Sequence, residues 1–523
     1  MAVIAPHLTA AMNLDERNII GRGEWPAGRG GRRCNDAASA AKVAAYVRGA
    51  GRDTRGPSPS SCAQASGIET LLSVENGPAV VERPLNGGHP DMAAQSRVVF
   101  CARGSGPQEW LTGADCRVLV RPCPQSPKGE IFASFRTSAG ESLDCIDRGD
   151  GTVWLPFSLA QAYENYVLER WTTDHGSRWL SPRELNMYYR VKRLIPRRVQ
   201  LAARRGLIAW RGNPDFPRWP HDDSVERLTR FLGTCVLRAL SAEEVPLRWF
   251  WPNGMRAAAI LTHDIEGPSG LRNALRIADL EEARGFRSCF NVVGDWYTID
   301  WGVIRELSQR GHEIGSHGLY HDRSLFSSRA SFEQQLPRLR ESVARLNAVG
   351  FRSPAIHRVP EWLAELPVEY DTTMPLSDPY EAQPGGVCSS WPFFIGNVVE
   401  LPYTLPQDHT LFNLMGCRDA GPWVEQMRRL KSSFGLIQCV SHPDRGYLGE
   451  SRNEAIYRDF LDILRDEEGV WHTLPRQVCE WWRARLGGRS LPGLNLTRGM
   501  IVKQERTTLA ELLPPTDDDP DFC

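Results

Sequence analysis

Two histidines spaced four residues apart form the pattern with the clearest chemical meaning. They are His317 and His321 in the segment SHGLYH, residues 316–321. On a helical turn this spacing places both imidazoles on one face, close enough to bind one metal ion. The alternative is a pair of unrelated histidines near the start of a helix. The chain has 12 histidines in all, and the spacing by itself leaves both interpretations open.

Two carboxylates follow an apolar segment near the middle of the chain. The run AAAILTHDIEG, residues 257–267, is typical of a strand that ends near Asp264 and Glu266. In an extended strand, side chains two residues apart point to the same side. Paired carboxylates at a strand end can divide the work of hydrolysis, because one can bind a metal ion while the other accepts a proton. The alternative is a solvent-exposed loop of charged residues.

Two further residues with useful chemistry stand at or near the ends of predicted strands. His442 follows the apolar run LIQCVS and precedes Pro443. A lone histidine is more often structural than catalytic, but its place at a strand end favours a role in a site. Arg352, in the segment GFRSP at residues 350–354, has the charge to pair with a carboxylate. The alternative for Arg352 is an ordinary surface charge before a turn.

The elements that must position these residues begin at about residue 246, where short apolar runs alternate with helical segments. This alternation predicts parallel strands joined by crossover helices. In such folds the active site gathers at the carboxyl ends of the strands. The predicted strands are 257–264, 288–293, 312–314, 351–356, 398–401 and 436–440, and the predicted helices are 271–284, 301–310, 330–348 and 476–486.

Taken together, these segments resemble the polysaccharide deacetylase family, the NodB-homology domain of carbohydrate esterase type. The matching motifs occur in the order of that family: THDIEG, SHGLYH, RSP, YDTT with SSWPF, and SHP. The resemblance covers residues 246–487. It implies an α/β fold, namely a distorted incomplete (β/α) barrel of parallel strands surrounded by helices.

The resemblance also implies a divalent metal ion bound by Glu266, His317 and His321. Two imidazoles and one carboxylate leave a coordination position open, as catalytic zinc sites require. Zn²⁺ suits this donor set, and Co²⁺, Ni²⁺ or Fe²⁺ would fit the same nitrogen and oxygen ligands. The sequence departs from the commonest family motif, TFDDG, because Ile265 separates the two carboxylates and the ligand is a glutamate. The longer side chain of glutamate is expected to shift the metal position.

The same motifs imply roles for residues that do not bind the metal. Asp264 resembles the general base, Arg352 the residue that keeps this base ionised and oriented, and His442 the general acid. Asp371 in YDTT is a candidate to orient His442. Trp391 in SSWPF is either an apolar wall of the pocket or an ordinary core residue.

The implied reaction is removal of an N-acetyl group from an amino-sugar unit of a glycan or glycan precursor by a metal-activated water. One alternative keeps this chemistry and changes the substrate to another linear or cyclic non-peptide amide. A second alternative is a catalytically silent carbohydrate-binding protein. A zinc protease is rejected, because His312, Glu313 and His317 form HExxxH, which has one residue more than the HExxH helix.

The remaining segments indicate organisation rather than chemistry. Residues 1–98 are rich in Gly, Arg, Ala, Ser and Pro without strand or helix periodicity, so we expect a mostly disordered segment. Residues 99–245 combine short apolar runs with turn clusters such as GDGT and predict a small accessory α+β region. Within it, one helix should start at the capping box SPRE, 181–184, and another should end at Gly206. Residues 488–523 are expected to form a tail.

Composition narrows the partners and the compartment. The formal charge is -1, from 62 basic and 63 acidic side chains, which gives no electrostatic reason to expect nucleic acid as a partner. The first residues lack the basic start and unbroken apolar run of a secretory signal, and no window resembles a membrane span. We therefore expect a cytoplasmic protein whose partner is a carbohydrate substrate. The 13 cysteines show no CxxC spacing and are expected to be mostly reduced.

Overall fold

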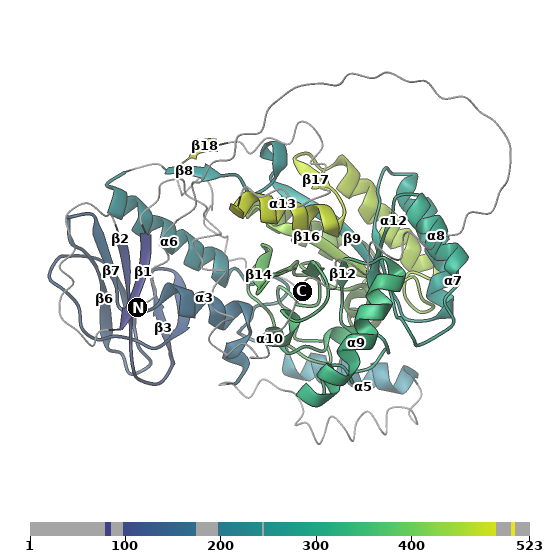
Figure 1. Cartoon of the computed structure of the whole chain (residues 1–523), viewed down its shortest axis with the longest axis horizontal. Coiled ribbons are helices and arrows are strands. Elements are labelled where there is room, and N and C mark those ends of the chain that lie inside the picture. Colours follow the sequence, from purple (N-terminus) through teal and green to yellow (C-terminus); the bar gives the residue numbers. More distant parts are fainter. Residues whose placement is uncertain (1–78, 85–97, 174–196, 243–244, 488–503, 508–523) are drawn as a thin grey trace, which may run out of the picture. The chain divides into compact units, whose positions relative to one another are not determined.

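The computed structural model describes residues 79–84, 98–173, 197–242, 245–487 and 504–507 (Figure 1). All described residues lie in one compact unit, Cys62–Cys523. The helix predicted to start at residues 181–184 lies outside the described residues. None of the helices that the structure describes is long and apolar enough to cross a membrane.

Seven strands of the accessory region form one mixed sheet with the order β1-β2-β7-β6-β5-β3-β4. β2 pairs in parallel with β1 and β7, and the other neighbours are antiparallel. The predicted GDGT turn joins β6 to β7, where Gly149 and Gly151 adopt φ angles of 73° and 85°. β1 lies within the segment that was expected to be mostly disordered. The strands are β1 (Ala79–Pro84), β2 (Val98–Arg103), β3 (Glu109–Gly113), β4 (Cys116–Val120), β5 (Glu130–Arg136), β6 (Ser142–Asp147) and β7 (Thr152–Leu155).

Helices α3 (Leu159–Val167) and α6 (Ser224–Leu240) pack against this sheet. α3 begins at Ser158, whose hydroxyl accepts a hydrogen bond from the backbone N–H of Gln161 at 2.9 Å, which satisfies a donor that the first helical turn leaves unpaired. A short 3-10 turn, η2 (Arg170–Thr173), follows α3. The apolar cluster that fills this region continues into the second large sheet, so the two sheets share one hydrophobic core.

Helix α5 (Arg197–Arg211) is longer than the sequence predicted, because it continues through Gly206. A single glycine costs about 1 kcal/mol in a helix interior and does not by itself end the helix. The helix ends instead before Gly212, whose φ is 68° and whose N–H donates to the carbonyl of Ile208 at 3.0 Å. The prediction that Gly206 closes this helix was therefore wrong.

A nine-stranded sheet forms the second half of the described chain, with the order β14-β15-β13-β12-β11-β10-β9-β16 and with β17 also paired to β9. All pairs are parallel except β14 with β15. Within the described residues, the outer strands β14 and β16 do not pair with each other, so the sheet does not close. The strands are β9 (Ala257–Ile265), β10 (Cys289–Val292), β11 (Glu313–Ser316), β12 (Gly350–Phe351), β13 (Tyr370–Asp371), β14 (Phe393–Ile395), β15 (Val398–Glu400), β16 (Leu436–Ser441) and β17 (Val470–His472).

Helices alternate with these strands along the chain, as the sequence pattern predicted. They are α7 (Pro268–Glu282), α8 (Trp301–Gln309), α9 (Arg329–Leu346), α10 (Pro360–Leu363), α11 (Gly421–Ser432), α12 (Ser451–Asp466) and α13 (Pro475–Gly487). The short helices are η3 (Pro252–Gly254), η4 (Pro354–Ile356) and η5 (His409–Met415). A separate two-stranded sheet pairs β8 (Val245–Arg248) with β18 (Gln504–Thr507). The predicted distorted, incomplete barrel of parallel strands is confirmed. The strand predicted at 351–356 is shorter, because Pro354, which has no N–H to donate, starts η4.

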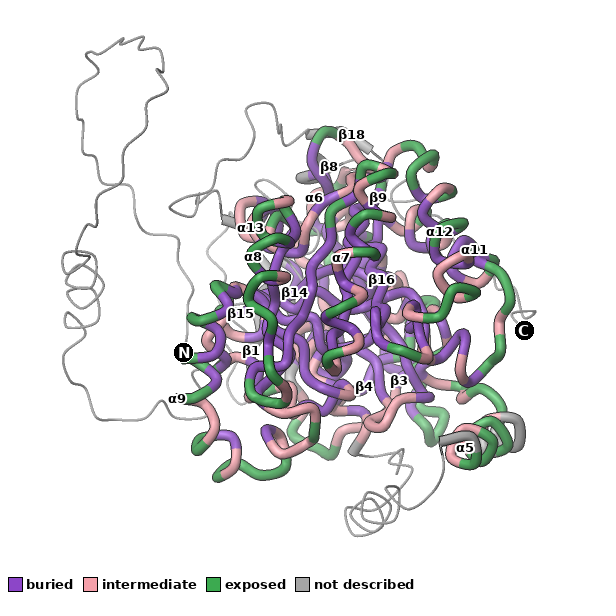
Figure 2. The backbone as a smooth tube through the Cα atoms, turned by 90° about the vertical axis from the view of Figure 1, so that its right-hand side faces the viewer, coloured by how far each residue is buried: buried purple, intermediate pink, exposed green. Residues whose placement is uncertain are grey.

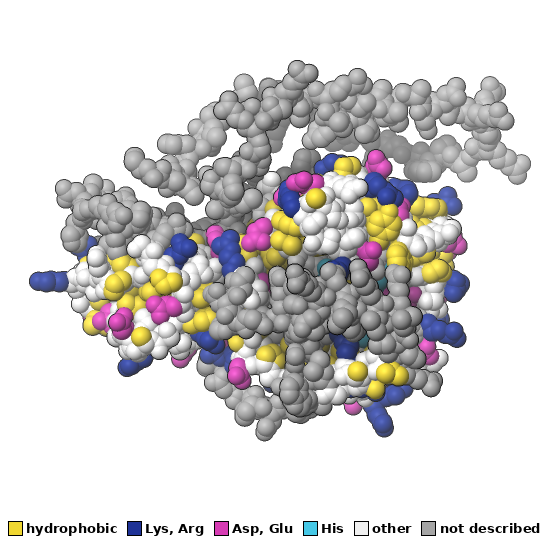
Figure 3. Space-filling model, turned by 90° about the horizontal axis from the view of Figure 1, so that it is seen from below, with side chains coloured by type: hydrophobic (Ala, Val, Ile, Leu, Met, Phe, Trp, Pro, Cys, Tyr) yellow, Lys and Arg dark blue, Asp and Glu magenta, His cyan; other side chains and the backbone are white. Residues whose placement is uncertain are grey.

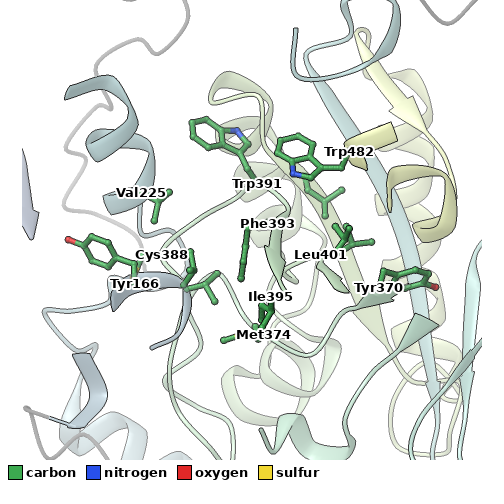
Figure 4. Packing of buried hydrophobic residues seen from close by; sticks show 14 of the residues in the cluster. Tyr166, Val225, Tyr370, Met374, Cys388, Trp391, Phe393, Ile395, Leu401 and Trp482 are labelled. Carbon is green, nitrogen blue, oxygen red and sulfur yellow. The ribbon is translucent and has the colours of Figure 1, made fainter. Parts of the chain in front are cut away.

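The strands around β9, β14 and β16 are drawn as almost wholly buried in Figure 2, whereas α8, α9 and α12 also carry exposed residues. All nine residues of β9 are buried, as expected for a parallel strand that is covered on both faces. Figure 4 shows Trp391 and Trp482 among the buried apolar side chains. Trp391 is fully buried, stacks on Phe250 with 5.0 Å between ring centroids, and donates from Nε1 to the carbonyl of Ser433 at 3.1 Å. It is therefore a core residue and not the wall of a pocket.

Buried polar contacts join the accessory region to the barrel. Arg358, after η4, donates from Nε and Nη2 to the two carboxylate oxygens of Glu169 at 2.8 and 2.5 Å. Both side chains are almost completely buried. On α6, the carboxyl of Glu226 accepts hydrogen bonds from the backbone N–H and the hydroxyl of Ser390 at 2.7 and 2.6 Å. The two regions are thus connected by groups that would be unsatisfied if either region stood alone.

We predict that Glu169→Ala lowers the free energy of unfolding by about 3–5 kcal/mol, because it leaves the Arg358 cation buried without its anion. The matched control is Glu365→Ala, which removes the exposed ion pair with Arg329 at 2.6 Å and should cost about 1 kcal/mol or less. Urea unfolding followed by circular dichroism measures both. Equal small losses in the two variants would contradict a structural role for the buried pair.

Candidate active site

The side chains singled out in the sequence lie at the carboxyl ends of neighbouring strands. Asp264 is the next-to-last residue of β9, and Glu266 follows that strand. Nε2 of His321 lies 3.1 Å from Oε1 of Glu266, and Nε2 of His442 lies 3.7 Å from the same oxygen. Nε2 of His317 lies 4.0 Å from Oδ2 of Asp264. Histidine side chains are visible on the face of the molecule drawn in Figure 3. The fold thus brings residues from distant parts of the sequence into one cluster.

Asp264 is a buried carboxylate that is held ionised. Nδ2 of Asn291 donates to its Oδ1 at 2.8 Å, and Nε of Arg352 lies 3.4 Å from the same oxygen. Burial raises the pKa of Asp264, but the nearby imidazole of His317 and the cation of Arg352 outweigh burial and hold the pKa below its ordinary value. Asp264 is therefore available to accept a proton. Asn291 was not predicted from the sequence, although it stands directly opposite Asp264 in the register of β10 and β9.

Arg352 is fully buried behind Asp264. Its Nη2 donates to the hydroxyl of Thr262 at 3.4 Å, and with the amide oxygen of Gln438 turned toward it, Nη2 also donates to that oxygen at 2.6 Å. The guanidinium lies 5.6 Å from the ring centroid of Tyr403. Its Nε and Nη1 have no hydrogen-bond partner. The positive charge of Arg352 is therefore compensated by the nearby carboxylates.

His317 follows β11 and has a defined tautomer. Its Nδ1–H donates to the backbone carbonyl of Arg352 at 3.0 Å, which leaves the lone pair on Nε2. Burial lowers the pKa of His317 to about 4. A neutral imidazole with an open Nε2 is the form that binds a metal ion.

His321 reaches the site from a loop and not from the helical turn that the spacing suggested. The chain leaves β11 at Ser316 and is not helical before α9. Gly318 has a φ of 76°, which is the reason that a regular turn does not form there. The ring centroids of His317 and His321 are nevertheless 5.4 Å apart. The four-residue spacing therefore brings the imidazoles together by a different backbone path.

The donor types at this cluster fit a divalent cation. Two donors bound to one zinc ion at normal bond lengths lie about 3–3.5 Å apart, and Glu266 and His321 are at 3.1 Å. Burial lowers the pKa of His321, but the Glu266 carboxylate at this distance outweighs burial and raises it. Among the described residues, however, no group of three or more His, Cys, Asp or Glu side chains is arranged closely enough to hold a metal. The side-chain positions thus bring two of the three predicted ligands to ligand spacing.

His442 follows β16 and is held by a carboxylate that the sequence analysis missed. Its Nδ1–H donates to Oδ1 of Asp408 at 2.7 Å, and its backbone N–H donates to Oδ2 at 2.8 Å. Burial lowers the pKa of His442, but Asp408 outweighs burial and raises the pKa to about 10. The imidazole is therefore protonated and directs Nε2 toward Glu266. The prediction that Asp371 orients His442 was wrong, because Asp408 fills that position.

Asp371 belongs to a separate buried pair with Glu400, its partner in the register of β13 and β15. Oδ1 of Asp371 accepts from the hydroxyl of Thr373 at 2.7 Å, and Oε1 of Glu400 accepts from the N–H of Met374 at 2.8 Å. The other two carboxyl oxygens have no donor. Burial raises the pKa of both groups, and Asp371 raises the pKa of Glu400 further. The pair therefore retains a proton between its two carboxyls.

Two further residues, Asp444 and Tyr447, contact the loops around the cluster. Asp444, in the SHPD segment, accepts from the N–H of Glu266 at 2.9 Å and from the N–H of Gly270 at 3.0 Å, and so ties the start of α7 to the end of β16. The ring of Tyr447 lies 4.7 Å from that of His442. These residues hold Glu266 and His442 in place from the side of β16.

The segment that supplies Asp408 contacts the accessory region. His409 begins the π-helix η5 directly after Asp408, and its Nε2 lies 3.2 Å from Nη1 of Arg204 on α5. Nε of Arg205 donates to the carbonyl of Asn413 at 2.8 Å. A helix from outside the predicted catalytic domain therefore packs against the residues that position the imidazole of His442.

We predict that Glu400→Gln becomes more stable relative to the wild type as the pH rises above about 4. The folded wild-type pair keeps a proton that unfolded carboxyls release near that pH, so the contribution of the pair to stability is complete below about pH 4. It is lost as the pH rises toward the higher folded pKa, at about 1.4 kcal/mol per pH unit for one proton. Urea unfolding at several pH values measures the difference. The control is Glu425→Gln, at an exposed carboxylate, and a difference for Glu400→Gln that is independent of pH would contradict the shared proton.

Comparisons with known proteins place part of the chain in a family. Residues 255–362 match the family model "Polysaccharide deacetylase". No curated protein matches the sequence. Three similar solved structures are a protein from Mycobacterium smegmatis assigned as a polysaccharide deacetylase (20% identity, TM-score 0.38, 46% of this chain and 94% of that chain), Puue allantoinase (16%, 0.37, 46% and 94%) and the peptidoglycan deacetylase PdaC from Bacillus subtilis (14%, 0.27, 45% and 94%).

The family match covers β9 to the start of α10, which includes Asp264, Glu266 and both histidines of SHGLYH. The structural similarities all have TM-scores below 0.5, so the assignment depends on the family model. The match to that family model supports hydrolytic deacetylase activity as the type of reaction. The resemblance predicted from the sequence is confirmed by the match of residues 255–362 to the polysaccharide deacetylase family model.

Proposed function

We propose that this protein is a metal-dependent hydrolase that removes an N-acetyl group from an amino-sugar unit of a glycan or glycan precursor. One observation carries the proposal. A buried carboxylate that is held ionised, Asp264, and a buried imidazole that is held protonated, His442, belong to the same cluster as Glu266 and His321. Environments that drive two titratable groups in opposite directions are characteristic of an acid–base pair.

Amide hydrolysis needs both groups because of the bond that is broken. A water that attacks the carbonyl must lose a proton, and the nitrogen leaves readily only after it gains one. Asp264, with its pKa held down by His317 and Arg352, is suited to accept the proton from water. His442, with its Nδ1–H anchored on Asp408, is suited to donate a proton from Nε2.

The proposed metal ligands are Glu266, His317 and His321. A divalent cation bound there would increase the acidity of water and stabilise the negative charge that develops on the carbonyl oxygen. Zn²⁺ suits two imidazoles and one carboxylate, and Co²⁺, Ni²⁺ and Fe²⁺ suit the same donors. The fixed tautomer of His317 and the 3.1 Å spacing of Nε2 of His321 from Oε1 of Glu266 support this assignment.

Two alternatives predict different results with the same protein. A hydrolase of other linear or cyclic amides would cleave small amides faster than N-acetylated sugars in a side-by-side panel. A silent carbohydrate-binding protein would bind sugars without releasing acetate. The grouping of a candidate base, Asp264, and a candidate acid, His442, with Glu266 and His321 favours an enzyme over the second alternative.

We predict acetate release from N-acetylglucosamine oligomers that requires a divalent metal. Prolonged chelation should abolish the activity and added Zn²⁺ should restore it. His317→Ala should lower kcat/KM by more than about 100-fold, since outer-shell changes at metal sites already cost about 10- to 100-fold. His472→Gln, in β17, serves as the control histidine. A chelated sample that keeps full acetate release would rule out the metal-dependent mechanism.

We also predict that Asp408→Asn shifts the alkaline limit of the reaction to lower pH. The carboxylate of Asp408 raises the pKa of His442, so its removal lowers that pKa and the general acid loses its proton sooner. Loss of a close opposite charge should move this limit by about 1–3 pH units. The measurement is the pH profile of kcat/KM, with Asp419→Asn as a control at an exposed residue. An unchanged alkaline limit would show that His442 is not the acid.

A further inference from the structure

A second group of buried polar side chains lies behind the strands that lead to Asp264 and His442. His263 precedes Asp264 on β9, and Ser441 ends β16 directly before His442. Successive side chains of a strand point to opposite faces of the sheet, so His263 points away from the site that Asp264 faces. His263 and Ser441 are both fully buried. The proposed reaction gives neither of them a direct role.

His263 and Ser441 connect the two strands at the level of the proposed base and acid. They are partners in the parallel register of β9 and β16, and Nδ1 of His263 lies 2.9 Å from Oγ of Ser441. Asp264 and His442 are each the next residue along the chain from this contact. The contact therefore limits how far the proposed base and acid can move apart.

Glu281 on α7 holds the other nitrogen of the His263 ring. Oε1 of Glu281 lies 2.7 Å from Nε2 of His263, and because an ionised carboxylate can only accept hydrogen bonds, Nε2 carries the hydrogen. The hydroxyls of Tyr457 on α12 and of Ser288 before β10 donate to the same carboxylate, each at 2.6 Å. Burial raises the pKa of Glu281, but its contacts with His263 and the two hydroxyls outweigh burial and hold the pKa below its ordinary value.

We call these five buried residues the rear network: His263, Glu281, Ser288, Ser441 and Tyr457. Each of them is bonded to at least one other member. A buried polar group that loses its partner destabilises the protein, so a displacement of one member is opposed by all the others. The rear network thus resists movement of β9 relative to β16, α7 and α12.

We propose that His263 and Glu281 are positioning residues that set the spacing between Asp264 and His442. Amide hydrolysis requires the base to reach the attacking water while the acid reaches the leaving nitrogen of the same bond. A misplacement of about 1 Å can lower the rate about 100-fold. This inference rests on the proposed function, and it extends the site to side chains on the opposite face of the sheet.

The test measures kcat and KM for acetate release from N-acetylglucosamine oligomers by the zinc-loaded full-length protein. His263→Phe keeps an aromatic ring, which still packs on Phe290, at a centroid distance of 4.8 Å in the wild type. It removes both hydrogen bonds of the imidazole, so kcat should fall about 100-fold while KM stays unchanged. Ser441→Ala removes a single hydroxyl and serves if His263→Phe does not fold, and its kcat should fall about tenfold.

Two substitutions of Glu281 separate positioning from stability. Glu281→Leu leaves Nε2–H of His263 without an acceptor, and kcat should fall about 100-fold. Glu281→Gln keeps an acceptor oxygen, and kcat should stay within about threefold of the wild type. The matched control is Glu226→Leu on α6, which removes a buried carboxyl bonded to Ser390. It should destabilise the protein to urea and leave the kcat of the folded protein unchanged.

Crystal structures of the wild type and Ser441→Ala give a readout that is independent of activity. The separation between the carboxylate of Asp264 and Nε2 of His442 should change by more than about 0.5 Å, the tolerance within which catalytic groups must be held. An unchanged separation would overturn the positioning role even if the wild type released no acetate. Acetate release by the wild type, with wild-type kcat in folded His263→Phe and Ser441→Ala, would support the hydrolase and overturn this inference.

Discussion

The candidate site depends on one constraint, which is that a carboxylate must stay ionised inside the protein. Asp264 lies on β9, a strand whose residues are all buried. An unpaired carboxylate in such a place would take up a proton, because its charged form loses hydration on burial. The hydrogen bond from Asn291, the cation of Arg352 and the nearby imidazole of His317 prevent this. Because these groups come from three other strand ends, the alignment of the parallel strands determines the ionisation of Asp264.

The balance between burial and the nearest partner also determines the protonation state at two other buried places. His442 would be neutral if burial acted alone, but its direct bond to Asp408 keeps it charged. Asp371 and Glu400 face each other without a bonded cation, so burial raises the pKa of each and they share a proton. In each of these three buried groups or pairs, the nearest partner decides which protonation state persists.

The sequence predicted the parts of the site that local patterns determine. Apolar runs that end near Asp264 and His442 indicated strand ends, the four-residue spacing paired His317 with His321, and the resemblance supplied their proposed roles. The sequence did not predict Asn291, whose contact with Asp264 depends on the register of two strands. It also did not predict Asp408, whose contact with His442 joins segments 34 residues apart. The path between the two histidines of SHGLYH depends on the positive φ of a glycine, which spacing alone does not reveal.

The accessory region contacts the barrel at several places, and one of them is the helix next to the residue that positions the proposed acid. Its buried contacts go to Arg358, Gly386 and Ser390, and the arginines of α5 reach the helix η5 that follows Asp408. Asp264 and its partners, in contrast, lie on β9 to β12 and are positioned by the barrel strands themselves. The two members of the acid–base pair are therefore held by different structures. A change in α5 should disturb the position of His442 before it disturbs the ionisation of Asp264, because the arginines of α5 contact the helix that directly follows Asp408.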